Sequence, residues 1–88
     1  MVLDIKIGPK ADRFLQDIDQ LTFDRLNRKI RELANKPRPR GAKKIVGEDG
    51  VFRIRVGVHR ILYSLEKNDQ TLLIVNIDKR SRVYKRYS

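Results

Sequence analysis

Three arginines in one short stretch are the residues of this chain whose type and spacing could do chemistry. Residues 51–63 read VFRIRVGVHRILY, so apolar residues alternate with Arg53 and Arg55, and the alternation resumes around Arg60. Gly57-Val58 fits a two-residue type II′ hairpin turn, which favours glycine at its first central position. This turn predicts that Arg55 lies opposite Arg60 and that all three arginines share one face of a sheet.

The other face of the same hairpin is predicted to be apolar. A register shifted by one residue would bring arginines against core residues, and burial of an unpaired guanidinium is very unfavourable. The residues expected to face the core are Phe52, Ile54, Val56, Ile61, Tyr63 and Leu65. The arginines are therefore expected on the exposed face of the sheet.

Like charges at directly opposed positions destabilise a bare antiparallel pair, so the pairing of Arg55 with Arg60 requires a source of negative charge. A structural source would be Glu48, Glu66 or Asp78. Of these, only Glu66 falls on the arginine face when positions are counted along its own strand. The functional source would be a bound anion, and converging guanidinium groups match phosphate best. We favour this second interpretation.

RNA cleavage by the 2′-hydroxyl is the phosphate chemistry that such a cluster could support. The reaction passes through a phosphorane with additional negative charge, which preorganised cations stabilise more than they stabilise the ground state. It also requires proton transfer, for which Tyr84 and Tyr87 near the C-terminus are candidates because neighbouring cations favour ionisation of a phenol. A tyrosine there could instead stack on a base, so the spacing alone does not separate a nuclease from an RNA-binding protein.

Two further segments are strongly basic. Residues 36–44, KPRPRGAKK, contain five cations and no acid, and Pro37 prevents the preceding helix from continuing. Residues 79–88, KRSRVYKRYS, contain five cations and two tyrosines. The first is either a solvated basic loop or a phosphate-contacting loop, and the second is a basic tail. The RNA contacts predicted from them are Lys43, Lys44, Arg82 and Lys85.

The composition supports a polyanionic partner. The chain has 88 residues, and its 21 Lys and Arg against 11 Asp and Glu give a formal net charge of +10. Such a charge indicates nucleic acid, nucleoprotein or an acidic protein as partner. The chain has no cysteine and one histidine, which disfavours a metal site. It has no apolar run of about 18 residues and no signal-peptide pattern, so we expect a cytoplasmic protein with no membrane segment.

The elements that must position these residues follow from hydrophobic periodicity. Alternation predicts strands over 2–7, 44–46, 51–56, 60–66 and 71–78, and a 3.6-residue period predicts two helices. The first helix begins near Pro9, and Asp19 or Thr22 caps the second. The order β-α-α-β-β-β-β predicts an α+β fold: a small antiparallel sheet with both N-terminal helices on one face, and the other face left to water or to a partner. Residues 1–88 are expected to form a single domain.

These features together resemble the RelE branch of the RelE/ParE toxin superfamily. The stretches that carry the resemblance are LANKPRPRGAKKIVGEDG, FRIRVGVHRILY and DKRSRVY, in this order. The resemblance implies a small sheet with two N-terminal helices and cleavage of mRNA in the ribosomal A site without a metal or cofactor. It also implies inhibition by a cognate acidic antitoxin similar to RelB.

The resemblance assigns the family's catalytic positions to Arg60, Arg53, Arg55, Arg80 and Tyr84. It implies that Arg60 and Arg80 stabilise transition-state charge, that Arg53 and Arg55 position phosphates, and that Tyr84 orients or deprotonates the 2′-hydroxyl. Two departures matter: arginines stand where the family may place lysines, and the short interval after Arg80 leaves Tyr84 or Tyr87 as the active tyrosine. The alternatives are a ParE-like toxin that acts on DNA gyrase and a non-enzymatic RNA-binding module.

Overall fold

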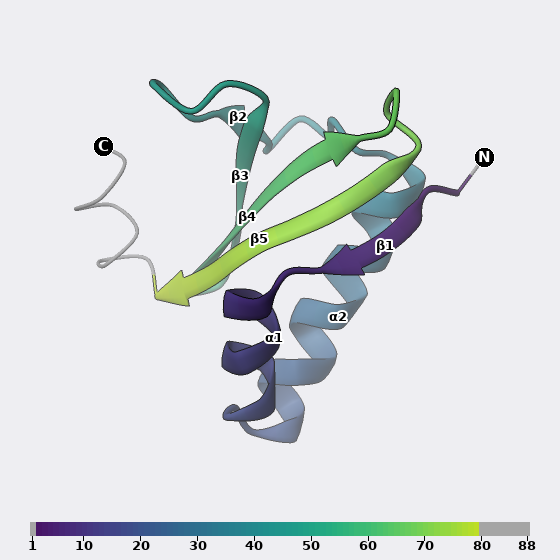
Figure 1. Ribbon diagram of the computed structural model, residues 1–88. Coiled ribbons are helices and arrows are strands. Elements are labelled where there is room, and N and C mark those ends of the chain that lie inside the picture. The colour runs from purple at the N-terminus through teal and green to yellow at the C-terminus, as the bar shows by residue number, and fades with distance from the viewer. Residues whose placement is uncertain (1, 80–88) are drawn as a thin grey trace.

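A computed structural model describes residues 2–79 as two helices and one five-stranded sheet (Figure 1). The sheet order is β1-β5-β4-β3-β2. In chain order the elements are β1 (Asp4–Ile7), α1 (Pro9–Gln16), α2 (Gln20–Asn35), β2 (Lys43–Lys44), β3 (Val51–Val56), β4 (His59–Glu66) and β5 (Thr71–Lys79). The predicted α+β class and element order are confirmed, with the short second strand one residue earlier than expected.

The sheet is mixed rather than wholly antiparallel. Strands β2 to β5 form antiparallel neighbours, as predicted, but β1 pairs with β5 in the parallel direction, with Asp4 opposite Thr71 and Ile7 opposite Ile74. The hairpin rule applies to strands joined by short turns. Two helices separate β1 from the other strands, so that rule does not fix the direction of β1.

Local sequence explains where the helices begin. Pro9 occupies the first turn of α1, where the missing N–H would have no partner within the helix. Gly8 precedes it because a Cβ there would lie 2.9 Å from the carbonyl oxygen of Ile74 on β5. Asp19 is the N-cap of α2: its carboxylate accepts hydrogen bonds from the Thr22 backbone N–H at 3.1 Å and from the Thr22 hydroxyl at 2.7 Å. Both bonds lower the pKa of Asp19.

Both helices cover one face of the sheet and enclose the main core. Ala11 of α1 and Leu26 and Ile30 of α2 are buried against it. The six hairpin residues predicted to face the core all belong to this cluster, five of them buried and Leu65 partly buried. The two helices therefore cover the apolar side of the hairpin.

The β3–β4 hairpin has the predicted register. Arg55 pairs with Arg60, Ile54 with Ile61 and Val56 with His59. Gly57 has a φ of 61°, a backbone conformation that a side chain disfavours, as the type II′ turn requires. A two-residue turn thus places three arginines on one face of the sheet.

The next ladder contains a bulge. Going from β4 to β5, Tyr63 pairs with Ile74 but the adjacent Leu62 pairs with Asn76, so the register skips Val75. An extra residue on one strand moves every later side chain to the other face. Ile74 and Ile77 consequently both face the helices although they are three residues apart.

The sequence predicted that the second face of the sheet is left to water or to a partner. In the structure, part of this face is covered by the chain itself. Leu62 points to this face and is 1% exposed, because Ile45 from the segment before β3 packs on it. Val51 and Val75 border this second, smaller cluster. The connection between β2 and β3 therefore covers one part of the face that carries the arginines.

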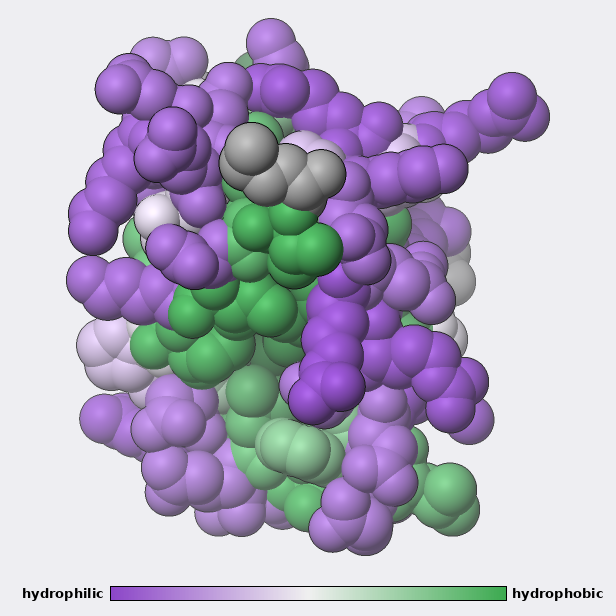
Figure 2. All heavy atoms as spheres, turned by 90° about the vertical axis from the view of Figure 1, so that its right-hand side faces the viewer, coloured by the Kyte–Doolittle hydropathy of each residue, from purple (hydrophilic) through white to green (hydrophobic). Residues whose placement is uncertain are grey.

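Apolar side chains remain exposed where β1 forms the edge of the sheet. Viewed from this side, hydrophobic residues form a continuous area between charged ones (Figure 2). Val2 is 62% exposed, and Ile5 on β1 is 42% exposed. Within residues 2–79, neither helix is long and apolar enough to cross a membrane.

Candidate nucleic-acid interface

A basic groove of about 640 Å³ lies along β3, beside the basic loop that follows α2. Its charged lining consists of cations alone: Lys29 from α2, Arg40 from the loop, Lys43 from β2, and Arg53 and Arg55 from β3. Three of the predicted site residues are therefore brought together here.

Arg53 and Arg55 owe their position to strand geometry. Side chains two residues apart on a strand share a face and lie about 7 Å apart. Lys43 pairs with Arg53 across β2 and β3, so its side chain joins the same row. Arg53 is half-buried and Arg55 is exposed. This row presents guanidinium and ammonium groups at spacings that a phosphate backbone can bridge.

Arg60 lies on the arginine face opposite Arg55, but its side chain is only 2% exposed. The prediction that Arg60 stands on an exposed surface is therefore wrong. A guanidinium tolerates burial only where opposite charge and hydrogen-bond acceptors surround it. The burial makes Arg60 a fixed cation behind Arg55 rather than an open ligand.

Asp78 is the acidic residue directly opposite Arg60. The two are paired in the β4–β5 register, so their side chains emerge on the same face as close neighbours. Counting along β4 alone had singled out Glu66, but Glu66 accepts a hydrogen bond from the Ser64 hydroxyl at 3.1 Å and lies at the far end of the strand. Without the bulge at Val75, Arg60 would have faced Ile77. The bulge thus places the carboxylate of Asp78 beside this arginine.

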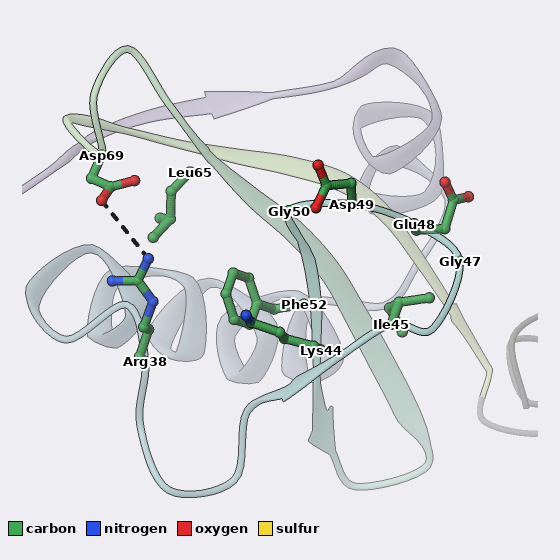
Figure 3. A pocket seen from close by; sticks show the side chains of 10 residues that line it. All are labelled: Arg38, Lys44, Ile45, Gly47, Glu48, Asp49, Gly50, Phe52, Leu65 and Asp69. Carbon is green, nitrogen blue, oxygen red and sulfur yellow. Dashed lines mark ion pairs between the residues drawn. The ribbon is translucent and has the colours of Figure 1, made fainter.

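Lys43 and Lys44, both predicted as RNA contacts, line different hollows. Successive residues of a strand point to opposite faces. Lys43 lines the basic groove, whereas Lys44 lines a second hollow of about 550 Å³ together with Glu48, Asp49 and Asp69 (Figure 3). The carboxylates around this hollow make it a poor phosphate site, so Lys43 is the better candidate.

A clamp, defined as Tyr63, Pro37 and Arg38, fixes the start of the basic loop on the sheet. The Tyr63 hydroxyl donates a hydrogen bond to the Pro37 carbonyl oxygen at 2.5 Å. The Arg38 guanidinium lies 5.6 Å from the centre of the Phe52 ring and 3.8 Å from the Asp69 carboxylate, an ion pair drawn in Figure 3. Burial raises the pKa of Tyr63 to about 12, against the opposing charge of Arg38.

No pattern in the sequence predicted this clamp. Its signal was only an aromatic residue at a core position and a proline just beyond a helix, and nothing in the sequence connects residues 26 positions apart. The clamp matters for the site because the loop it holds carries Arg40 to the groove.

The remaining predicted residues lie outside the described range. These are Arg80, Arg82, Tyr84, Lys85 and Tyr87. The single histidine, His59, packs edge-on against Phe14 at 5.6 Å between ring centres, which is a structural contact. Among residues 2–79, no group of three His, Cys, Asp or Glu side chains could hold a metal ion.

Comparisons with known proteins agree with this architecture. The chain is 26% identical over 88 residues to a protein of Methanocaldococcus jannaschii named RelE1, covering 97% of this chain and 98% of that protein. The toxin subunit of an archaeal RelE–RelB complex from Pyrococcus horikoshii superimposes with a TM-score of 0.78 at 25% identity, covering 93% of this chain and 99% of that one. The isolated RelE toxin of E. coli shares the fold, with a TM-score of 0.76 at 18% identity over 96% of this chain and 93% of that one.

A family model also matches most of the sequence. The sequence model of the ParE toxin of the type II toxin–antitoxin system parDE matches residues 5–84, from the first strand to beyond the last described one. The match includes both helices, the basic loop and the arginine hairpin. The chain therefore belongs to the ParE toxin family of type II toxin–antitoxin systems, within the RelE/ParE superfamily, and is a RelE-like toxin.

Proposed function

We propose that this toxin is a ribosome-dependent endoribonuclease that cleaves mRNA in the A site and so inhibits translation in the cytoplasm. The observation that carries the proposal is the groove lined by Arg53, Arg55 and Lys43 with no acidic residue in its lining. A surface of this kind favours a ligand with several phosphates. The resemblance to RelE toxins supplies the reaction.

The proposed reaction is a transesterification that needs no metal. The 2′-oxygen attacks the adjacent phosphorus, the bond from phosphorus to the 5′-oxygen breaks, and the products are a 2′,3′-cyclic phosphate and a 5′-hydroxyl. A base accepts the proton of the 2′-hydroxyl, and an acid donates a proton to the leaving oxygen. The phosphorane carries more negative charge than the ground state, so fixed cations lower the barrier.

The chain's residues divide between binding and charge stabilisation. Arg53 and Arg55 bind phosphates on either side of the scissile bond. Arg60 and Arg80 stabilise the phosphorane, and the burial of Arg60 favours this role because a rigid charge needs no reorganisation during the reaction. Tyr84 orients or deprotonates the 2′-hydroxyl. Lys43 is the main RNA contact from the loop, and Lys44, Arg82 and Lys85 remain candidate contacts.

Cell-free translation tests the proposal. Purified toxin should stop synthesis and leave mRNA cut within A-site codons, and Arg55→Ala, Arg60→Ala and Arg80→Ala should each reduce cutting by orders of magnitude. Because Arg60 is buried, its variant needs a thermal melt alongside, and Arg60→Lys provides the control that keeps the charge. Tyr84→Phe keeps the ring and loses the hydroxyl, so it separates proton transfer from stacking. Stalled ribosomes that contain intact mRNA would refute the proposal.

Action on DNA gyrase is the second candidate, because the matching family description names a ParE toxin. In that case the toxin would leave mRNA intact and cause DNA damage in a gyrase assay. A non-enzymatic RNA-binding module would do neither and would retain RNA binding in Tyr84→Phe.

A cognate antitoxin is the proposed protein partner. Two structural relatives, from Pyrococcus horikoshii and Methanococcus jannaschii, are RelE–RelB complexes. An acidic antitoxin would complement the formal charge of +10 and could compete with RNA for the basic groove. Co-purification of this chain with the product of a neighbouring acidic reading frame, with loss of mRNA cutting in the complex, tests the assignment.

A further inference from the structure

The basic groove extends beyond the residues that the catalytic proposal uses. Lys29 on α2 and Arg40 on the loop line it together with Lys43, Arg53 and Arg55, although the loop, β2 and a turn separate α2 from β3 in sequence. Nothing in the sequence distinguishes Lys29 from the other cations on the same helix, so no role was predicted for it. The packing of α2 against the core face of the sheet brings Lys29 to the groove, and Arg53 and Arg55 of β3 line the same groove from the other face.

The positive charge of this groove is largely uncompensated. Within residues 2–79, Arg40, Lys43, Arg53 and Arg55 form no ion pair, and the ion pair of Lys29 is with Glu32 at 3.0 Å, one turn along its own helix. Adjacent like charges destabilise a folded surface unless an anion occupies it. The arrangement is therefore explained better by a ligand than by stability.

The lining also indicates which part of a nucleic acid the groove would contact. It contains Pro39, Gly41 and Ile54 besides the cations, and no aromatic ring. Sequence-tolerant or sequence-specific contact with bases relies on stacking or on hydrogen bonds to base edges. Lysine and arginine also donate to guanine edges, but this lining offers no ring for stacking, so its main contacts are expected with phosphates, which supply most of the affinity of a basic surface for nucleic acid.

We propose that Lys29 and Arg40 form a phosphate-binding extension of the site, which holds the RNA strand on one side of the scissile bond. This inference rests on the proposed function for the identity of the nucleic acid.

The test measures binding of a single-stranded 2′-O-methyl RNA, which cannot be cleaved, to the full chain by fluorescence anisotropy over a range of salt. Each phosphate contact contributes about 0.7 to the slope of log K against log salt for a single strand. The double variant Lys29→Ala/Arg40→Ala should reduce the magnitude of this negative slope by about 1.4 and weaken binding at least tenfold. Lys29→Arg/Arg40→Lys, which keeps both charges, should restore most of the slope.

The matched control removes two exposed cations that do not line the groove. Lys6→Ala/Arg31→Ala lowers the formal net charge by the same two units, and should leave the slope unchanged. Equal slopes for the two double variants would overturn the inference, because the effect would then be one of net charge alone. Failure of the catalytic proposal looks different: mRNA would stay intact in translation reactions while the groove variants still lost RNA affinity.

Discussion

Replacement of Tyr63 by Phe tests the clamp that holds the basic loop. The variant keeps the ring stacked on Phe52, at 5.5 Å between ring centres, and removes only the hydroxyl that donates to the Pro37 carbonyl oxygen. A single neutral hydrogen bond of this kind contributes about 1 kcal/mol. In a domain of this size that lowers the Tm by about 4–8 °C at neutral pH.

The pH dependence makes the prediction sharper. Burial raises the pKa of Tyr63 to about 12 in the folded protein, above its ordinary value of 10.0. The folded state therefore holds the proton more tightly than the unfolded state, and the associated stability is complete below pH 10 and is lost as pH rises towards 12. One pKa unit corresponds to about 1.4 kcal/mol, so the wild type should lose about 2–3 kcal/mol across this range. The Phe variant lacks this contribution, so the difference in stability between the two proteins isolates it from the other groups that titrate in this range.

The assay is chemical denaturation of both proteins from pH 8 to pH 12. The wild type should be the more stable protein at pH 8, the difference should shrink above pH 10, and the order should reverse before pH 12. Arg38→Ala serves as control, because it removes the contacts with Phe52 and Asp69 but keeps the phenol and its alkaline loss. A difference between wild type and Tyr63→Phe that stays constant to pH 12 would refute the buried, hydrogen-bonded phenol.

The other predictions concern the second face, a helix cap and the groove. Leu62→Ala should destabilise the protein by about 2–5 kcal/mol in urea titration, because it leaves a cavity under Ile45; a loss below 0.5 kcal/mol would mean that this cluster is loosely packed. Asp19→Ala should lower the Tm at pH 7, and the deficit should disappear as pH falls below 3.8, since hydrogen bonds lower the pKa of Asp19 in the folded state and its stabilisation is lost on protonation; Asp19→Asn should keep most of the cap at both pH values. Arg55→Ala should change the free energy of unfolding by no more than about 0.5 kcal/mol, because the side chain is exposed, while RNA affinity falls; a large loss of stability would show that Arg55 has a structural partner.

The basic loop shows what lay beyond prediction from sequence. Its composition predicted a phosphate-contacting segment, but alternation could not say that Lys43 faces the groove and Lys44 a mixed-charge hollow, because the strand they form is only two residues long. The contacts that anchor the loop join residues distant in the chain, which no local pattern reveals. The position of Lys29 in the groove also depends on packing between distant parts of the chain, so no local pattern predicted it.

The sequence by itself determined the hairpin register. A glycine at the turn and strict alternation leave one pairing that keeps guanidinium groups out of the core, so Arg53, Arg55 and Arg60 had to share a face. Tertiary structure decided which of them meets solvent. The bulge at Val75 brings Asp78 opposite Arg60, and packing buries this arginine while Arg55 stays exposed. Local periodicity fixes the face on which a side chain lies, but its exposure depends on segments that only the complete fold brings over it.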